Sequence, residues 1–197
     1  MKVQLKNQYT YNRSKISFQS QRLYPFKLEK PDKDCYCFFS RLEKSDVLRL
    51  FKDRENIKNS EYGYIIFRTF VRELNGKEYG GDYFAIESKD GEIKGLADIF
   101  EGRNWIEINH LQALRKPFEC IKGIGTGLLY GICKLAKEKG HIMVELDAAN
   151  RELFDYYKNL GFKQTEHNPF HFYLTDQDYA SFLKNIERIY EDYKYED

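Results

Sequence analysis

Residues 105–129, WIEINHLQALRKPFECIKGIGTGLL, decide how the rest of the sequence is interpreted. Apolar residues recur along 105–114, and we predict a strand there. A loop follows, and then the glycine-rich turn 122–127. Apolar residues at helical spacing predict a helix over 128–139, which Gly140 ends.

The glycine-rich turn has the composition of an anion-binding site. Glycines let backbone N–H groups approach a ligand closely, and a helix N-terminus adds unpaired donors and a partial positive charge. Lys122 adds a full positive charge. Together these features suit a phosphate or a pyrophosphate. A plain tight turn between a strand and a helix would explain the same three glycines, so a second motif is needed to choose.

Two common phosphate-binding motifs fit the turn poorly. A Walker turn needs a lysine after its glycines, and here Lys122 precedes them. The dinucleotide fingerprint needs Gly-x-Gly-x-x-Gly, whereas Gly123, Gly125 and Gly127 are evenly spaced. An acidic residue, Asp147, does lie about 20 residues further on, as that fingerprint requires. The dinucleotide interpretation is therefore weakened but stays open.

The turn 122–127 resembles the (Arg/Gln)-x-x-Gly-x-(Gly/Ala) turn of the GNAT superfamily of acyl-CoA-dependent N-acetyltransferases, with lysine in the first position. The family's second motif is an Asn, a Tyr seven residues later and then a Gly-Phe pair. It resembles Asn150, Tyr157 and Gly161-Phe162. The two motifs lie in the family's order, and the resemblance covers roughly residues 34–175.

The resemblance implies a single GNAT-like domain of the α/β (α+β) class. We expect a central mixed, mostly antiparallel, twisted sheet of about seven strands, flanked by about four helices. A hairpin with Asp-Gly at its turn is predicted within 83–100, and a pair of helices within 45–74 is expected over the acceptor side. The predicted division is a basic N-terminal extension (1–33), the GNAT-like domain (34–175) and an acidic amphipathic C-terminal helix (176–197).

The two ends of the chain carry opposite charge. Residues 1–33 contain eight basic and two acidic residues, whereas 176–197 contain seven acidic and three basic ones. Partly alternating apolar residues in the extension predict one or two strands or extended segments. The extension is either a solvated edge or an arm for an acidic partner such as RNA. The C-terminal helix packs on the core, pairs with the arm or forms a dimer contact.

The composition bounds the class of protein. The chain of 197 residues is long enough for a substantial core. Its net charge of +1 gives no general attraction to nucleic acid or membranes, so neither partner is expected. No apolar stretch approaches ~20 residues, and a cytoplasmic protein is expected. Free thiols are expected rather than a metal site, because zinc-site spacing is absent among Cys35, Cys37, Cys120 and Cys133.

Acetyl transfer to an amine requires proton transfer. A lysine-like amine has a pKa of ~10.4, and its deprotonation at pH 7 costs roughly 4.6 kcal/mol. The resemblance implies Glu107 as the general base, directly or through water, because several members carry a glutamate six residues before the position of Ala113. An exposed or ion-paired glutamate fits the sequence equally well. Asp98 and His110 are alternative bases, and His110 shares the face of Glu107 only if a β-bulge intervenes.

The resemblance implies the other functional groups as well. Tyr157 matches the family tyrosine that often protonates the departing thiolate, although packing against the cofactor would also explain it. Tyr156 is expected to point elsewhere, into the core. Acetyl-CoA is the expected co-substrate, with no metal. The expected cofactor-binding residues are Leu111, Gln112 and Ala113 for the pantetheine amides, Lys122, Gly123, Ile124, Gly125, Thr126 and Gly127 for the pyrophosphate, and Asn150 for the pantetheine.

The sequence-based hypothesis is an N-acetyltransferase that moves an acetyl group from acetyl-CoA to a primary amine of a small molecule, peptide or protein. The alternatives are a non-catalytic acyl-CoA-binding or interaction module of the same fold, and a toxin that acetylates aminoacyl-tRNA. A homodimer is compatible with each. The acceptor's identity is not encoded in a readable motif, because substrate choice lies in loops and helices of variable sequence.

Overall fold

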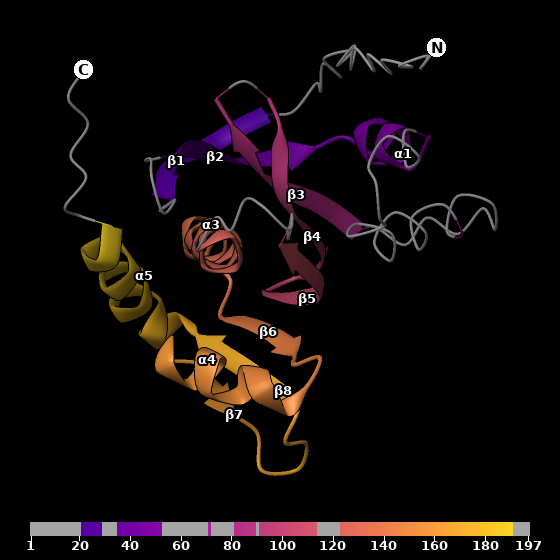
Figure 1. The fold of residues 1–197 in the computed structure, drawn as a ribbon. Coiled ribbons are helices and arrows are strands. Elements are labelled where there is room, and N and C mark those ends of the chain that lie inside the picture. Colours follow the sequence, from indigo (N-terminus) through magenta and orange to yellow (C-terminus); the bar gives the residue numbers. More distant parts are fainter. Residues whose placement is uncertain are drawn as a thin grey trace, which may run out of the picture.

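The computed structural model describes residues 21–28, 35–52, 71, 81–89, 91–113 and 123–190. The strands in these ranges form one sheet in the order β1-β2-β3-β4-β5-β6-β8-β7 (Figure 1). Only the pair β5 and β6 is parallel. The strands are β1 Gln21–Leu28, β2 Cys35–Leu42, β3 Gly81–Ser88, β4 Ile93–Glu101, β5 Trp105–Ala113, β6 Met143–Asp147, β7 Lys163–Gln164 and β8 His171–Thr175. The helices are α1 Lys44–Lys52, α3 Ile124–Lys139, η1 Arg151–Leu153, α4 Phe154–Asn159 and α5 Asp176–Tyr190.

This architecture confirms the predicted mixed, mostly antiparallel sheet. It holds eight strands rather than about seven, because β1 lies within the basic N-terminal segment and pairs with β2 from Gln21↔Arg41 to Leu28↔Cys35. The alternating residues of 1–20 and most of the second predicted helix lie outside the described residues. No helix in the described ranges is long and apolar enough to cross a membrane.

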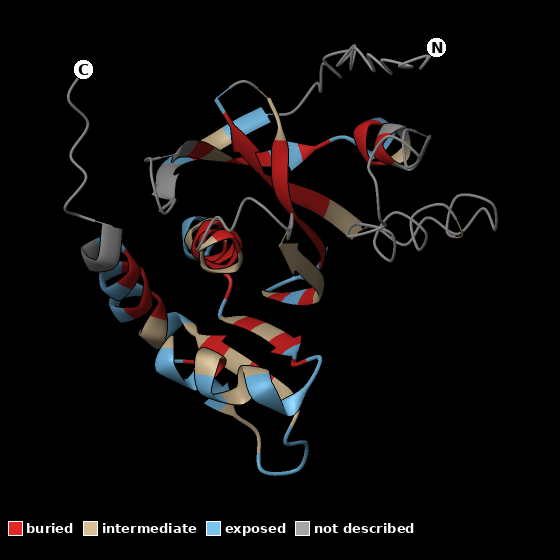
Figure 2. Ribbon diagram, viewed as in Figure 1, coloured by how far each residue is buried: buried red, intermediate tan, exposed pale blue. Residues whose placement is uncertain are grey.

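The two faces of the sheet are covered differently. Helix α3 packs on one face against strands from β1 to β6, and α5 packs on α3. Figure 2 shows α3 with buried residues along most of its length. On the other face a smaller apolar cluster includes residues of α1. We call this side of the sheet the α1 face. The residues of the cluster are Leu42, Val47, Leu50, Tyr83, Ala85, Ile93 and Leu96.

Helix α3 lies too close to the sheet for side chains at two contact points. A Cβ atom added to Gly131 would overlap the ring of Phe39 on β2. Phe39 is fully buried and stacks on Phe84 at 4.9 Å, so it has no room to retreat. A Cβ atom added to Gly95 on β4 would likewise overlap Ile124 at the start of α3. These glycines hold α3 at a fixed height above the strands.

The C-terminal helix α5 is amphipathic, as predicted, and its apolar face packs on the core. The start of α5 is fixed by Asp178, whose carboxylate accepts hydrogen bonds from the N–H (3.2 Å) and the hydroxyl (2.6 Å) of Thr175. The Tyr130 hydroxyl of α3 donates to Glu187 of α5 at 2.7 Å. The buried residues of α5 are Tyr179, Phe182, Leu183 and Ile186.

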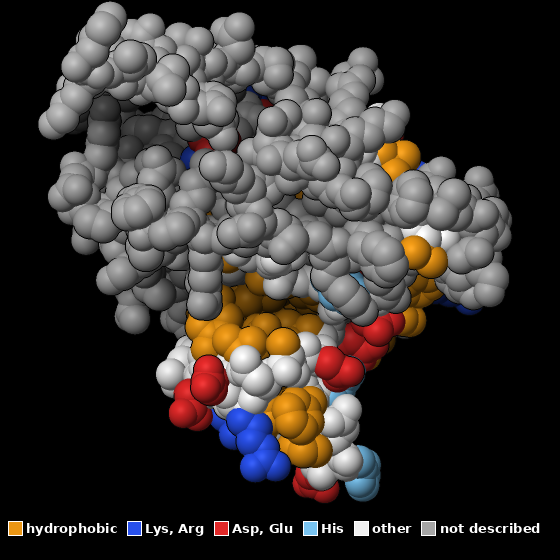
Figure 3. All heavy atoms as spheres, turned by 45° about the vertical axis from the view of Figure 1, so that its right-hand side comes forward, with side chains coloured by type: hydrophobic (Ala, Val, Ile, Leu, Met, Phe, Trp, Pro, Cys, Tyr) orange, Lys and Arg blue, Asp and Glu red, His pale blue; other side chains and the backbone are white. Residues whose placement is uncertain are grey.

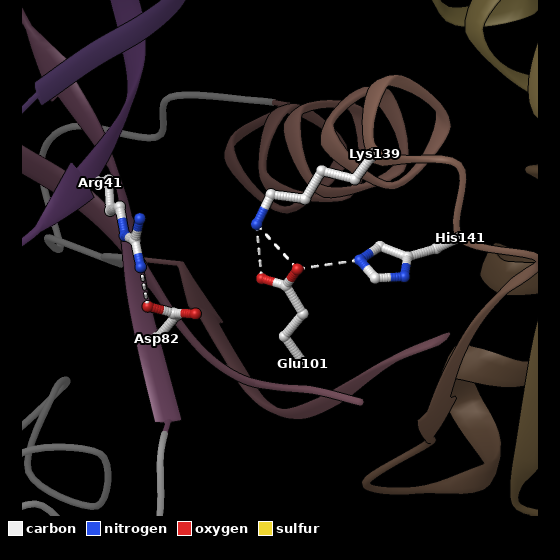
Figure 4. Close-up of polar contacts among 5 residues, drawn as sticks. All are labelled: Arg41, Asp82, Glu101, Lys139 and His141. Atoms are coloured by element: carbon white, nitrogen blue, oxygen red, sulfur yellow. Dashed lines mark hydrogen bonds and ion pairs between the residues drawn. The ribbon is translucent and has the colours of Figure 1, made fainter. Parts of the chain in front are cut away.

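A polar cluster ties the C-terminal end of α3 to the end of β4 (Figure 4). Lys139 donates to both carboxylate oxygens of Glu101, at 2.8 and 2.6 Å, and the buried His141 contacts the same carboxylate at 2.9 Å. Arg41 and Asp82 pair nearby. Burial alone would raise the pKa of Glu101, but the bonds from Lys139 and His141 outweigh it and hold that pKa below its ordinary value.

This lowered pKa makes the stability contributed by Glu101 dependent on pH. Its carboxyl has a lower pKa folded than unfolded, so the stabilisation is complete above about pH 4.3 and is lost as the pH falls through the folded pKa. We expect Glu101→Gln to reduce the free energy of unfolding by about 1 kcal/mol at pH 7 and by progressively less as the pH falls below about 4.3. Urea unfolding at pH 7 and at a series of lower pH values measures this, with the exposed Glu166→Gln as control; a difference that does not shrink as the pH falls contradicts it.

Candidate functional site

The glycine-rich turn forms the first turn of α3. Gly123 precedes the helix in the left-handed conformation, at φ 89° and ψ 0°, which side chains at this position would strain. The helix begins at Ile124, four residues earlier than the apolar spacing predicts, so that Gly125 and Thr126 lie at its N-terminus. Gly123 offers no side-chain cap. Donors of this turn are therefore available to an anion at the positive end of the helix dipole. Lys122 lies outside the described residues.

The edge of β5 beside this turn is unpaired within the described part of the chain. The parallel pairing of β5 with β6 runs from Trp105↔Met143 to Ile108↔Leu146 and then stops. Residues 109–113 continue as strand, and among the described residues 110–113 pair with β4 alone. The two parallel strands thus separate after Ile108, and we call the space that follows the opening. Leu111, Gln112 and Ala113, expected to bind pantetheine, lie along it.

A β-bulge at Asn109 changes which side chains face the opening. Ile108 pairs with Ile99 and His110 with Asp98, so Asn109 has no counterpart on β4. Glu107 pairs with Phe100, two residues from Asp98. Residues opposite each other share a face, and so do residues two apart. The β-bulge that would allow His110 to share a face with Glu107 is therefore present.

His110 consequently lies on the same face of the sheet as Glu107. This is the α1 face, since Asp98 also pairs with Tyr83 of the α1 cluster. Nδ1 of His110 lies 3.4 Å from Oδ2 of Asp98. The Asp98 side chain is 1% exposed and that of His110 is 20% exposed. A buried carboxylate thus holds a half-buried imidazole beside the opening.

Glu107 lies at the rim of the site. Its side chain is exposed, and its neighbour on β6 is Glu145, which the register places directly opposite. Glu145 is 3.4 Å from Nε2 of His171, whose Nδ1 contacts Asp147 at 2.9 Å. Figure 3, seen from the side that α1 occupies in Figure 1, shows an apolar hollow with Asp and Glu side chains beside it. The rim carries negative charge, which suits a cationic acceptor.

The two tyrosines of α4 occupy different environments. Tyr157 is buried and packs against Phe172 at 5.4 Å and Phe162 at 5.9 Å. Burial raises the pKa of Tyr157 to about 12, so its phenol stays protonated at neutral pH. Tyr156 is half-buried, and its hydroxyl lies 3.1 Å from Oγ1 of Thr126 in the first turn of α3.

Tyr156 packs partly against the core, as predicted, but the sequence did not predict that its hydroxyl lies at the glycine turn. A Cβ atom added to Gly125 would lie 3.4 Å from the Tyr156 hydroxyl and 3.6 Å from Leu111. Tyr156 therefore borders both the glycine turn and the edge of β5. Adjacent helical residues point about 100° apart. Two consecutive tyrosines therefore differ in their surroundings, with Tyr157 inside the core cluster and Tyr156 at its border.

Asn150 lies directly before η1 in an extended conformation, with φ −156° and ψ 171°, and is exposed. Its proposed contact with pantetheine stays a prediction. No group of three or more His, Cys, Asp or Glu residues within the described ranges is arranged to hold a metal ion.

No protein-family model matches the sequence, and no curated protein matches it. Solved structures do match the fold. One is the apo form of FdhC, a nucleotide-linked sugar GNAT, with a TM-score of 0.56 and 13% identity over 85% of this chain and 98% of that one. Another is a mutant of the spermidine N-acetyltransferase SpeG from Vibrio cholerae, with a TM-score of 0.51 and 14% identity over 72% of this chain and 94% of that one.

A third similar structure is a mutant AtaT toxin bound to the C-terminus of the antitoxin AtaR and to acetyl-CoA. Its TM-score is 0.47, at 14% identity over 64% of this chain and 86% of that one. The chain has the GNAT fold, as its two sequence motifs predict. At identities this low, the structural similarity establishes the fold alone and does not identify the reaction.

Proposed function

We propose, from the GNAT fold and the geometry of its glycine turn, that this protein transfers an acetyl group from acetyl-CoA to a primary amine. The observation that carries the proposal is the juxtaposition of two sets of backbone donors. The first turn of α3 offers its N–H groups beside the strand edge 111–113, which is unpaired on one side within the described residues. The turn suits a pyrophosphate, and the edge suits the amides of a pantetheine arm.

The direction of the cofactor follows from these two contacts. With its pyrophosphate at α3 and its pantetheine along 111–113, its thioester would lie in the opening. Glu107 lies at the rim of this region on β5 and is the base that the sequence resemblance implies, while Tyr157 on α4 is the implied acid. The amine would attack the thioester carbonyl directly, because binding both reactants in one site removes much of the entropic cost of bringing them together. A cofactor-binding module without turnover is the competing proposal.

The acceptor proposed here is an amine that arrives as a cation. Glu107 and Glu145 lie opposite each other at the rim, on the face that approaches the opening. A protein or peptide amine and a small amine both satisfy this charge. The basic N-terminal segment leaves acetylation of aminoacyl-tRNA as an alternative, and a cytoplasmic location and a homodimer belong to the same proposal.

Turnover is tested by thioester consumption with a panel of amines. We expect acetyl-CoA to be consumed only when an amine is present, with one acetylated amine formed per free thiol. Binding of coenzyme A without consumption for any small amine, peptide or aminoacyl-tRNA would favour the non-catalytic module. No heat of binding with coenzyme A in a calorimeter at millimolar concentration would contradict both proposals.

Binding of coenzyme A at the glycine-rich turn is tested at Gly125. Methyl groups on residue 125 would occupy the space through which a phosphate approaches the first-turn amides, so Gly125→Val should weaken coenzyme A binding at least about tenfold, or ~1.4 kcal/mol. Calorimetric titration measures the dissociation constant. The control is Gly140→Asn at the far end of α3, where asparagine tolerates the left-handed φ of 73°. Equal affinity in the two variants would place the cofactor elsewhere.

A further inference from the structure

We infer that His110 is the general base of the proposed acetyl transfer and that Asp98 is its positioning residue. This inference rests on the proposed function, and it replaces Glu107 in the proton-accepting role. The sequence alone left these residues as alternatives. The bulge at Asn109 and the contact between the two side chains distinguish them.

The contact with Asp98 fixes the tautomer of the His110 ring. An ionised carboxylate only accepts hydrogen bonds. Nδ1 of His110 lies 3.4 Å from Oδ2 of Asp98, so Nδ1 carries the proton in the pair. In the neutral ring the lone pair then resides on Nε2. The Asp98 side chain is 1% exposed, so its carboxylate is buried within the sheet and is the group that orients the ring in this proposal.

The position along β5 also favours His110. Glu107 precedes Ile108, the last residue that pairs with β6, so it lies on the closed part of the sheet. His110 is two residues past that point, within the opening, and directly precedes the strand edge proposed for pantetheine. A base must come within hydrogen-bond or one-water reach of the amine nitrogen. The imidazole lies closer along the strand to the expected thioester.

The charged groups around His110 are consistent with this division of roles. On the described α1 face Asp98 of β4 is its direct partner, Tyr83 of β3 follows in the same row, and Glu107 is its neighbour on β5. Glu145 faces Glu107 from β6. Among these described groups the Asp98 carboxylate contacts the ring, and Glu107 and Glu145 lie at the rim, where they attract the ammonium group of the acceptor.

The proton balance of the reaction is complete with these groups. Nε2 of His110 takes one proton from the ammonium, and the free amine attacks the thioester carbon. The new C–N bond forms, the C–S bond breaks, and the thiolate takes a proton from the Tyr157 phenol. The amide nitrogen loses its second proton, which returns to Tyr157, and His110 releases its own proton to solvent. The products are the amide, the free thiol and one proton.

Matched variants separate the two bases. We expect His110→Asn to lower kcat by about 100-fold or more with coenzyme A affinity unchanged by calorimetry, which also shows that the variant is folded. Glu107→Gln should keep kcat within about tenfold and raise KM for the amine. Asp98→Asn should lower kcat and leave coenzyme A affinity unchanged, since the ring loses the carboxylate that orients it.

The opposite pattern overturns the inference without touching the proposed function. If Glu107→Gln loses the rate while His110→Asn keeps it, Glu107 is the base. A readout independent of turnover is the ring tautomer, measured by nitrogen NMR of histidine-labelled protein. We expect the His110 signal to show a proton on Nδ1 in the wild type and to change in Asp98→Asn. A neutral ring protonated on Nε2 overturns the inference even if no amine is acetylated.

Discussion

A Gly131→Ala variant is expected to lose about 2–3 kcal/mol of unfolding free energy through a single added methyl group. The methyl carbon would overlap the ring of Phe39, which is fully buried and stacked between Tyr24 and Phe84. Either the ring leaves its rotamer or α3 moves off the sheet. Urea unfolding monitored by circular dichroism gives the midpoint and its slope.

The sign of this effect is what makes it informative. Glycine to alanine inside an exposed helix normally stabilises by about 1 kcal/mol, so destabilisation reports the overlap alone. Gly125→Ala in the same helix is the matched control, since its Cβ meets neighbours only at 3.4 and 3.6 Å. We expect its stability to stay equal or to rise. Equal loss in both variants would show that the distance between α3 and β2 is not what residue 131 controls.

The sequence predicted the elements whose signals are local. The Asp-Gly hairpin is confirmed as β3 and β4, and Gly91 has the positive φ of 85° that its turn requires. Gly140 ends α3 in the left-handed conformation at φ 73°, as predicted. The apolar spacing of the last helix correctly predicted a core-packed face on α5. At the hairpin and at the end of α3, the glycine that ends the element also adopts the backbone conformation that the turn requires.

Features that depend on pairing between distant strands were not predictable in the same way. Strand β1 lies among basic residues with weak alternation, and it is a strand because β2 offers an edge. The side chain of His110 faces the α1 face only because Asn109 is unpaired, and nothing in the local alternation locates that bulge. The contact between Asp98 and His110 spans a hairpin. The resemblance therefore directed attention to β5, while the register shows that His110 shares the face of Glu107.

The largest loss of rate outside the base is expected at Tyr157. Tyr157→Phe removes the phenol that the family resemblance assigns to the departing thiolate, and we expect kcat to fall by about 100-fold with little change in coenzyme A affinity. Burial holds the pKa of Tyr157 at about 12, so the group is protonated and able to donate throughout the neutral range. Its aromatic packing against Phe162 and Phe172 is retained in the variant, so the fold is expected to persist.

Tyr156→Phe is the matched control, because it removes a hydroxyl from the adjacent position of the same helix. That hydroxyl pairs with Thr126 at the glycine turn, so its loss should weaken coenzyme A binding severalfold while kcat stays near wild type. Steady-state rates with saturating acetyl-CoA separate the two effects. If instead Tyr156→Phe loses the rate and Tyr157→Phe keeps it, the proton donor is the tyrosine at the turn and Tyr157 belongs to the core. That outcome would mean that the proton donor on α4 is identified by its structural environment and not by its position in a motif. We infer the same for the base on β5, where His110 takes the place of Glu107.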